Sequence, residues 1–359
     1  MISSAPTDPE APLSPRVRPI IWLALTALLI TAFSLELAIG SLMIPIKSVI
    51  AILAGSPDAP ESWRQIVLLF RLPRALTAML AGCALGIAGL NMQTLFRNPL
   101  ADPFVLGISS GASLGVALVV LAANGLNWGG WLTRARMAGN LSIILAATVG
   151  ALAVLGIVLV VARRVENTIT LLIVGLMFGY ITSSMVSILM QFSGEHQMQS
   201  YVTWTFGSFA GVTWKQLTVF APAVIVGTSG VWLMAKPLNA FLLGDAYARS
   251  MGVPVRRMRN LIIIGAALLA GAVTAFCGPI GFLGIAVPHL CRALLKTTDH
   301  HVLVPAVVLL GASLALFADL IAQVPGSHIS LPLNAVTALI GAPVVVAVIL
   351  RRRHVMEAG

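Results

Sequence analysis

Charged residues are scarce in this sequence. Only 9% of its 359 residues are Asp, Glu, Lys or Arg, whereas 58% are hydrophobic. Soluble domains carry roughly 25% charged residues, so this chain has too few charges to cover the surface of a soluble protein of its size. Apolar runs long enough to cross about 30 Å of hydrocarbon recur along it. The composition therefore predicts an integral membrane protein.

Several chemical signatures are also absent. The sequence has no GxxxxGK[ST] loop, which excludes nucleotide hydrolysis through that motif. Its three cysteines, Cys83, Cys277 and Cys291, lie in apolar surroundings at spacings that match no metal site. The net charge of +10 does not indicate nucleic-acid binding, because the cations lie between apolar runs. We expect no enzyme, no metal site and no cofactor bound by this chain.

Ten apolar segments predict an all-α integral membrane protein with about ten transmembrane helices. We expect one transmembrane domain over 20–353, with tails at 1–19 and 354–359. The third and eighth segments are short and rich in glycine, which is tolerated where protein surrounds a broken or tilted helix. The predicted spans are 20–40, 73–92, 108–123, 140–162, 169–192, 215–234, 260–276, 280–295, 303–322 and 333–350.

The distribution of Lys and Arg predicts the orientation. Ten spans place both termini on one side of the membrane. Most of the 22 Lys and Arg residues fall in the tails and in the loops that lie on that same side. Cytoplasmic loops are enriched in these residues, so both termini are expected in the cytoplasm.

The stretch "LLFRLPRALTAML" runs against that trend. Arg71 and Arg74 flank Pro73, which suits the first turn of a helix, and this orientation places them on the outer face. Three residues apart, they share one face of a helix. They either bind lipid headgroups or form a docking site for an acidic partner outside the membrane.

Acidic residues within the spans are few. Asp319, in "LALFADLIAQ", is the main one, and Glu36 lies near the outer end of the first span. Asp319 is either a paired structural group or part of a transport pathway. Ion-coupled carriers usually need several buried ionisable groups, so the scarcity argues against that class.

The loop "KPLNAFLLGDAYARSMGVPVRRMRN" contains a predicted short helix. Asp245 is a suitable N-cap, and Gly252 followed by Pro254 is a suitable stop signal. Seven residues at about 1.5 Å each make a rod of about 10 Å. This helix either inserts into a cleft on another protein or connects two spans at the membrane surface.

These motifs together resemble the FecCD-type permease subunits of type II ABC importers, which carry iron–siderophore complexes, haem and vitamin B12. The resemblance runs in order from about residue 66 to the C-terminus. It implies the type II ABC importer permease fold, with ten spans in each of two paired permeases. The matching stretches include "RLPRALTAMLAGCALGIAGLNMQTLFRNPLADPFVLGISSGASLG", "GDAYARSMGV", "GPIGFLGIAVPHLCR", "TDHHVLVPAVVLLGASLALFAD" and "LPLNAVTALIGAPVVVAVILRR".

The resemblance also implies roles for individual residues. Arg71 and Arg74 correspond to outer arginines that pair with glutamates of a periplasmic binding protein. A third family arginine corresponds to Gln323, a departure for which Arg64 is a candidate replacement. Asn98 and Leu100 match a cytoplasmic gate. The helix that couples to an ATPase corresponds to Gly244, Asp245, Ala246, Tyr247, Ala248, Arg249, Ser250, Met251 and Gly252.

Other candidates are less specific. The side chains of Met190, Phe192, Trp204 and Phe206 either line the pathway or form a core or lipid-facing stripe. His196, in the outer loop "EHQMQ", is expected to be solvated and not a haem ligand. His289 is expected to be structural, and Arg292 lies near the cytoplasmic gate without an assigned role.

The predicted function is that of the permease subunit of an ATP-driven importer in the bacterial inner membrane. Its expected partners are a second permease copy, two ATPase subunits that bind ATP and Mg²⁺, and a periplasmic binding protein. The expected cargo is a bulky iron chelate, either a siderophore complex or haem. The alternatives are a vitamin B12 importer, an ion-coupled secondary transporter and a membrane scaffold.

Overall fold

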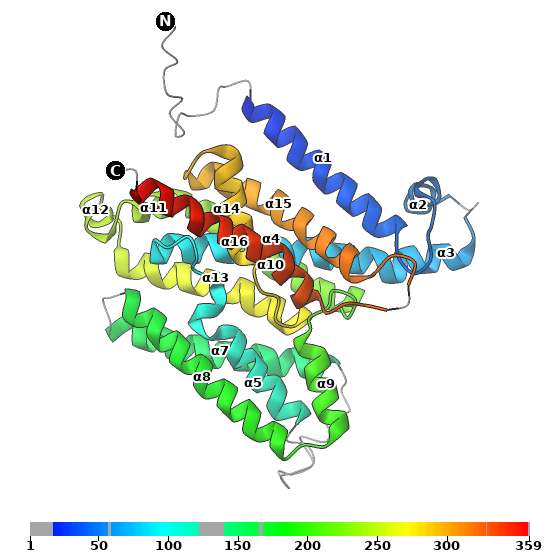
Figure 1. Ribbon diagram of the computed structural model, residues 1–359, viewed down its shortest axis with the longest axis horizontal. Coiled ribbons are helices and arrows are strands. Elements are labelled where there is room, and N and C mark those ends of the chain that lie inside the picture. The colour runs from blue at the N-terminus through cyan, green and yellow to red at the C-terminus, as the bar shows by residue number, and fades with distance from the viewer. Residues whose placement is uncertain (1–16, 57–58, 122–139, 165–167, 328, 358–359) are drawn as a thin grey trace, which may run out of the picture.

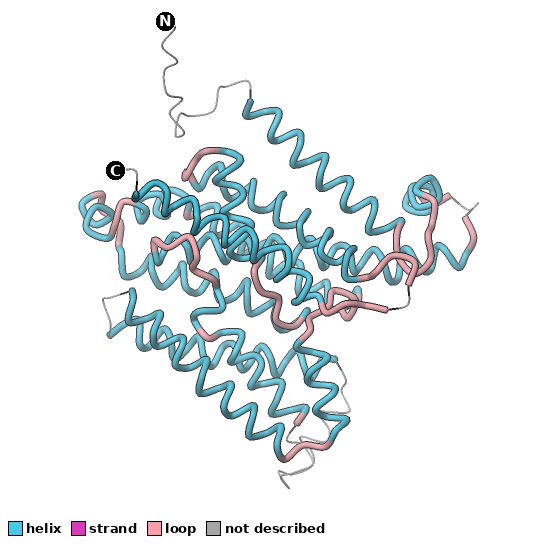
Figure 2. The backbone as a smooth tube through the Cα atoms, viewed as in Figure 1, coloured by secondary structure: helices cyan, strands magenta, loops and turns pink. Residues whose placement is uncertain are grey.

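The computed structural model describes residues 17–56, 59–121, 140–164, 168–327 and 329–357, and all regular structure in these residues is helical (Figures 1 and 2). The predicted tail 1–19 lies almost wholly outside the described residues, and α16 continues into the predicted tail 354–359. The helices are α1 (Val17–Ala38), α2 (Ile46–Leu53), α3 (Glu61–Gln65), η1 (Ile66–Arg71), α4 (Leu72–Phe96), η2 (Pro103–Leu106), α5 (Ile108–Val120), α7 (Asn140–Arg164), α8 (Thr168–Gln191), α9 (Glu195–Thr205), α10 (Trp214–Leu233), α11 (Ala235–Leu242), α12 (Asp245–Ser250), α13 (Val255–Cys277), α14 (Leu283–Leu295), α15 (His300–Ala322) and α16 (Leu333–Glu357).

The ten predicted spans correspond one to one with apolar helices. Among the described residues, seven helices are long and apolar enough to cross a membrane, and they contain α1, α4, α7, α8, α10, α13 and α15. Two shorter apolar helices, Ile108–Val120 and Leu283–Leu295, and the apolar segment Leu333–Val346 of α16 account for the rest. The third and eighth spans are thus short, as their glycine content predicts. The all-helical membrane fold is confirmed.

Helix α4 is the centre of the bundle, and α13, α14 and α15 pack around it (Figure 1). The stretch "AGCALGIAG" explains this position. A Cβ atom added to Gly82 would lie 2.1 Å from the carbonyl oxygen of Gly311, and one added to Gly89 would lie 1.8 Å from that of Gly284. Small residues allow helix backbones to touch in this way, so α4 fits directly against α15 and α14.

A second group of helices consists of α5, α7, α8 and α9, which lie together at one side of the molecule (Figure 1). Glycine again sets the spacing, since a Cβ atom on Gly115 would lie 2.1 Å from the oxygen of Ala146. Helix α13 contacts both α7 and α4. It therefore joins this group to the central one.

The two ends of the bundle differ. The start of α1 and the end of α16 lie toward the end that carries α12, whereas α2 and α3 lie at the opposite end (Figure 1). We call these the α12 end and the α2–α3 end. This arrangement agrees with an even number of spans. The short helices α2, α3, α9 and α11 lie where only loops were predicted.

Candidate functional site

A polar depression of about 620 Å³ opens at the α2–α3 end of the bundle. Three cationic residues line it, namely Arg71, Arg74 and Lys215. The first two come from the η1–α4 helix and the third from the start of α10, so residues far apart in the sequence meet at one surface. We call this surface the outer depression.

Arg74 is held by an ion pair at the floor of the outer depression. Its Nε and one terminal nitrogen donate to the two carboxylate oxygens of Asp319 on α15, at 2.7 and 2.9 Å. Glu36 of α1 lies 3.9 Å away, and the side-chain amide of Gln323 donates to that carboxylate. Glu36 and Asp319 are each 1% exposed. Asp319 is thus a paired group, as one of the two predicted alternatives has it.

Arg71 has a different environment. It is 9% exposed, and its guanidinium donates to the backbone carbonyl of Leu37 at 2.8 Å and to that of Leu42. These carbonyls belong to the end of α1 and to the connection toward α2. Arg71 therefore fixes this connection and faces the outer depression from its wall.

The helix that carries these arginines begins earlier than predicted. Glu61 is its first residue, and the π-helical turns of η1 run without a break into α4. The predicted start at Pro73 is therefore wrong. Pro73 follows the π-helical segment, where its missing N–H is tolerated because the wider turn already alters the hydrogen-bond pattern. Neither arginine lies at a free helix N-terminus.

Arg64 and Lys215 differ in their position relative to the outer depression. Arg64 does not line the outer depression, because its guanidinium donates to the backbone carbonyl of Ser56 at 2.6 Å and lies 3.8 Å from Glu61. Lys215 does line it and is exposed. Lys215 and Arg74 line the same depression, which sequence reasoning missed. The neighbouring Trp214, whose indole donates to the Leu68 carbonyl, orients this part of α10.

The predicted cytoplasmic gate is a capped turn at the α12 end. Arg97 ends α4 in the left-handed region, with φ 47°. The side-chain oxygen of Asn98 accepts a hydrogen bond from the N–H of Leu100 at 3.0 Å. Asn98 is exposed and Leu100 is half-buried. The turn is a compact structure at the end of the central helix.

The predicted coupling helix is present as α12. Its N-cap is Gly244, with φ 102°, and not the predicted Asp245, which is the first helical residue. Gly252, with φ 81°, follows the helix, and its N–H donates to the Arg249 carbonyl while that of Val253 donates to the Ala248 carbonyl. This paired arrangement is the Schellman motif. The stop signal in the sequence is confirmed.

Helix α12 presents apolar side chains outward. Tyr247 is 50% exposed and Met251 is 60% exposed, whereas Ala248 is buried. The outer face of this helix thus combines the apolar side chains of Tyr247 and Met251 with the exposed Arg249.

The predicted pathway residues come from α8, α9 and the connections that follow them. Phe192 is 75% exposed and Phe206 is 43% exposed, while Met190 and Trp204 are half-buried. Helix α8 also exposes a stripe of hydroxyl side chains that sequence reasoning missed. The signal is in "YITSSMVSIL", where polar residues recur at helical spacing, and the stripe consists of Tyr180, Ser183, Ser184 and Ser187.

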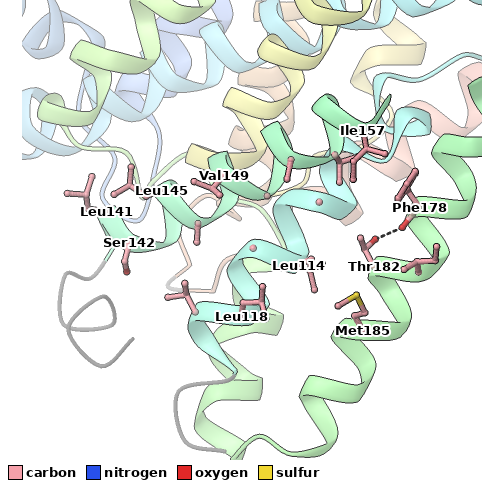
Figure 3. Close-up of a pocket in the computed structure, with 18 residues that line it drawn as sticks. Leu114, Leu118, Leu141, Ser142, Leu145, Val149, Ile157, Phe178, Thr182 and Met185 are labelled. Atoms are coloured by element: carbon pink, nitrogen blue, oxygen red, sulfur yellow. Dashed lines mark hydrogen bonds between the residues drawn. The ribbon is translucent and has the colours of Figure 1, made fainter. Parts of the chain in front are cut away.

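An apolar groove of about 690 Å³ lies between α5, α7 and α8 (Figure 3). Leu114, Leu118 and Leu145 are among its lining residues. The hydroxyl of Thr182 donates to the carbonyl of Phe178 at 2.8 Å and is therefore already engaged (Figure 3). Small-molecule sites combine apolar walls with a few polar groups that fix orientation. This groove lacks such a set among the residues that line it and is not the candidate site.

The remaining candidates lie elsewhere. Arg292 donates to Gln93 at 2.6 Å, beneath the gate, and His196 is exposed on α9. Within the described part of the chain, no group of three or more His, Cys, Asp or Glu side chains is arranged to hold a metal ion.

The apolar helices, the cationic outer depression and the capped helix at the opposite end define a polytopic membrane protein whose two ends differ. The family model for the FecCD transport family matches residues 28–351. The chain belongs to this family and is an importer permease of the type II ABC class, a subunit that is not itself catalytic.

Individual relatives agree with this assignment. The chain is 36% identical over 338 residues to the vitamin B12 import system permease protein BtuC of Klebsiella pneumoniae, covering 92% of this chain and 94% of the relative. It is 35% identical over 322 residues to BtuC of Salmonella arizonae, covering 87% and 92%. A solved structure described as an inward-facing conformation of a proposed metal-chelate type ABC transporter has a TM-score of 0.80 and 28% identity, covering 93% of this chain and 99% of that one.

Proposed function

We propose that this permease moves a bulky metal chelate from a periplasmic binding protein into the cytoplasm of a bacterium. The outer depression is the observation that carries the proposal, because it collects three cations at one mouth of a ten-span bundle. Such a surface suits an acidic protein partner. The hydroxyl stripe on α8 and the exposed side chains of Phe192 and Phe206 offer polar and apolar surfaces for a large amphipathic cargo.

The proposal includes separate ATPase subunits that bind ATP and Mg²⁺. The exposed side chains of Tyr247 and Met251 on α12 are suited to insertion into a groove of such a subunit. Short helices with apolar anchors bind grooves in this manner. We further propose two copies of the permease around one path, with α12 and both termini on the cytoplasmic side.

The first candidate for the chelate is an iron complex, which is either a ferric siderophore or haem. A corrinoid is the second candidate, and the 36% identity to vitamin B12 permeases favours it. Both are metals held in large organic ligands, so the same wide passage serves either.

Reconstitution in proteoliposomes with the ATPase and the binding protein tests the function. Uptake of radiolabelled ferrichrome, haemin or cyanocobalamin is measured with ATP on the α12 side. ATP-dependent uptake of one of them is expected. Uptake that persists without the ATPase subunit would show an ion-coupled carrier instead. The compound that accumulates decides between the iron complex and the corrinoid.

A further inference from the structure

A chain of buried polar side chains joins three helices at the α12 end of the bundle. Thr94 of α4 lies with its hydroxyl oxygen 2.8 Å from Nε2 of His300, the first residue of α15. Nδ1 of His300 lies 2.7 Å from the side-chain oxygen of Asn239 on α11. The Asn239 amide nitrogen donates to Asp299 at 2.7 Å. His300 is 1% exposed and Thr94 is 0% exposed.

The partners determine how this chain is protonated. The Asn239 side-chain oxygen also accepts the backbone N–H of His300 at 2.9 Å, which fixes the amide orientation. Nδ1 of His300 must then carry a proton to donate to the same oxygen. In the neutral ring, Nε2 is an acceptor, and the Thr94 hydroxyl has two acceptors within reach, this nitrogen and the Leu90 carbonyl oxygen, each at 2.8 Å. The Asn239 amide also lowers the pKa of the Asp299 carboxyl, because it donates a hydrogen bond to the ionised form.

This chain lies directly beside the coupling helix. Helix α11, which carries Asn239, is separated from α12 only by Leu243 and Gly244. The N-cap of α12 also lies close to the end of α4, since a Cβ atom on Gly244 would lie 2.9 Å from a guanidinium nitrogen of Arg97. Displacement of α12 therefore acts directly on α11, which contacts both α4 and α15, as well as on α13, which α12 also contacts.

Helices α4 and α15 are packed so closely that a displacement of one end is transmitted along both helices. Their backbones touch at Gly82 and Gly311, so no flexible side chain separates them there. Packed interiors resist deformation and move between discrete arrangements. The opposite ends of the same two helices carry Arg74, which lines the outer depression, and Asp319, which is paired with it.

We propose that the Asn239–His300–Thr94 chain is the link through which movement of α12 reaches the α4–α15 pair and thereby the outer depression. Asn239 and His300 are positioning residues in this proposal, since they touch no cargo. The inference rests on the proposed coupling of α12 to an ATPase subunit. It adds which side chains carry that coupling and which helices receive it.

The experiment reports on the outer depression while nucleotide binds at the other end. Ser41, an exposed residue that lines the depression, is replaced by Cys and labelled with an environment-sensitive fluorophore. Cys277 and Cys291 are buried and Cys83 is half-buried, so labelling favours the new thiol. The complex of permease and ATPase in nanodiscs is then exposed to the non-hydrolysable analogue β,γ-imido-ATP. The fluorescence change is compared between variants.

We expect the signal change to fall at least fivefold in Asn239→Ala and in His300→Ala, and the double variant to lose no more than either single one. His301→Ala is the matched control, because this neighbouring histidine is exposed and its ring packs on Trp232 and not on Asn239 or Thr94. It should retain the full signal. An exchange that restores the bond with donor and acceptor reversed, Asn239→Asp with Asp299→Asn, should recover most of the signal.

Co-purification of the ATPase distinguishes failure of the proposed function from failure of the Asn239–His300–Thr94 link. If the unaltered permease retains no ATPase, the proposed function fails and not this link alone. If Asn239→Ala retains the ATPase and the full signal, the link is wrong. If His300→Ala does not fold, the double variant Asn239→Asp with Asp299→Asn decides instead. If this double variant has the thermal stability of the unaltered protein but not its fluorescence change, the contact is purely structural and the proposal is overturned.

Discussion

Asp319 on α15 accepts two hydrogen bonds from the guanidinium of Arg74 on α4, at 2.7 and 2.9 Å, across a sequence separation of 245 residues. The two-point geometry fixes the relative rotation of the two helices at this end, since both oxygens of the carboxylate are used. An acidic partner that approaches the outer depression thus meets an arginine whose charge is already shared with Asp319. Any such partner competes with, or adds to, this pair.

Removal of the acid tests this pair. Asp319→Ala removes both hydrogen bonds that hold Arg74 and leaves only the more distant Glu36, at 3.9 Å. It should lower the free energy of unfolding by about 3 kcal/mol, since loss of one member of a buried pair is strongly destabilising. Thermal unfolding of the purified protein in detergent measures the change. Glu61→Ala is the control, because it breaks only the exposed contact with Arg64 and should change stability by less than about 1 kcal/mol. Equal melting temperatures for both variants would contradict the structural role of Asp319.

Docking of the binding protein should depend on Lys215. Lys215→Glu is expected to weaken association roughly tenfold, mainly through slower binding, because charges at the rim of an interface act on the association rate. Raising the salt concentration should weaken the unaltered complex as well. Surface plasmon resonance on permease in nanodiscs measures both effects. Arg64→Glu should have little effect, since Arg64 does not line the outer depression, and the opposite order of effects would argue against this surface.

The close contact of α4 with α14 predicts a strong substitution effect. Gly89→Ala adds a Cβ atom that would lie 1.8 Å from the Gly284 carbonyl oxygen, so the helices must separate. Overpacking of this kind costs about 1–3 kcal/mol, and the melting temperature should fall. Gly156→Ala on α7 is the matched control, because nothing lies within 4 Å of its added Cβ atom. That variant should be neutral or slightly stabilised, because Ala favours a helix more than Gly does. A comparable loss in both variants would show that the close contact at Gly89 is not the cause.

Replacement of the N-cap glycine should disturb the coupling helix. Gly244 has φ 102°, a conformation that L-residues rarely adopt, and its added Cβ atom would lie 2.9 Å from Arg97. Gly244→Ala is expected to strain this turn by about 1–3 kcal/mol and to reduce retention of the ATPase on an affinity-tagged permease. Gly211→Ala, at a position with open space around it, serves as the control. Full retention in Gly244→Ala would show that the turn is not needed for coupling.

Asn91 offers a prediction of increased stability. Its side chain is 0% exposed in the middle of α4, and neither its nitrogen nor its oxygen has a hydrogen-bond partner. An unsatisfied buried polar group costs about 1–3 kcal/mol, so Asn91→Leu should raise the melting temperature. A lower melting temperature would mean that the amide is bonded in the folded protein.

The sequence by itself determined the number of spans, the short third and eighth helices, and the capped helix between α11 and α13. These features depend on local physics: the length of an apolar run, the glycine content of a helix, and the φ preference at a helix end. The glycines of "AGCALGIAG" also indicated close helix packing, although not which helices would meet. Helices α2, α3, α9 and α11 were not predicted, because their apolar runs are short.

Only the tertiary structure decided how charges at distant positions meet. Nothing local in the sequence pairs Arg74 with Asp319, brings Lys215 to the outer depression or joins Asn239 to His300. Pro73 also predicted a helix start, whereas the helix that carries Arg74 begins at Glu61. The π-helical turns that precede Pro73 and tolerate its missing N–H form only in the packed bundle. Side-chain partners across helices depend on the rotation and depth of each span, and these are set by the packing of all helices together.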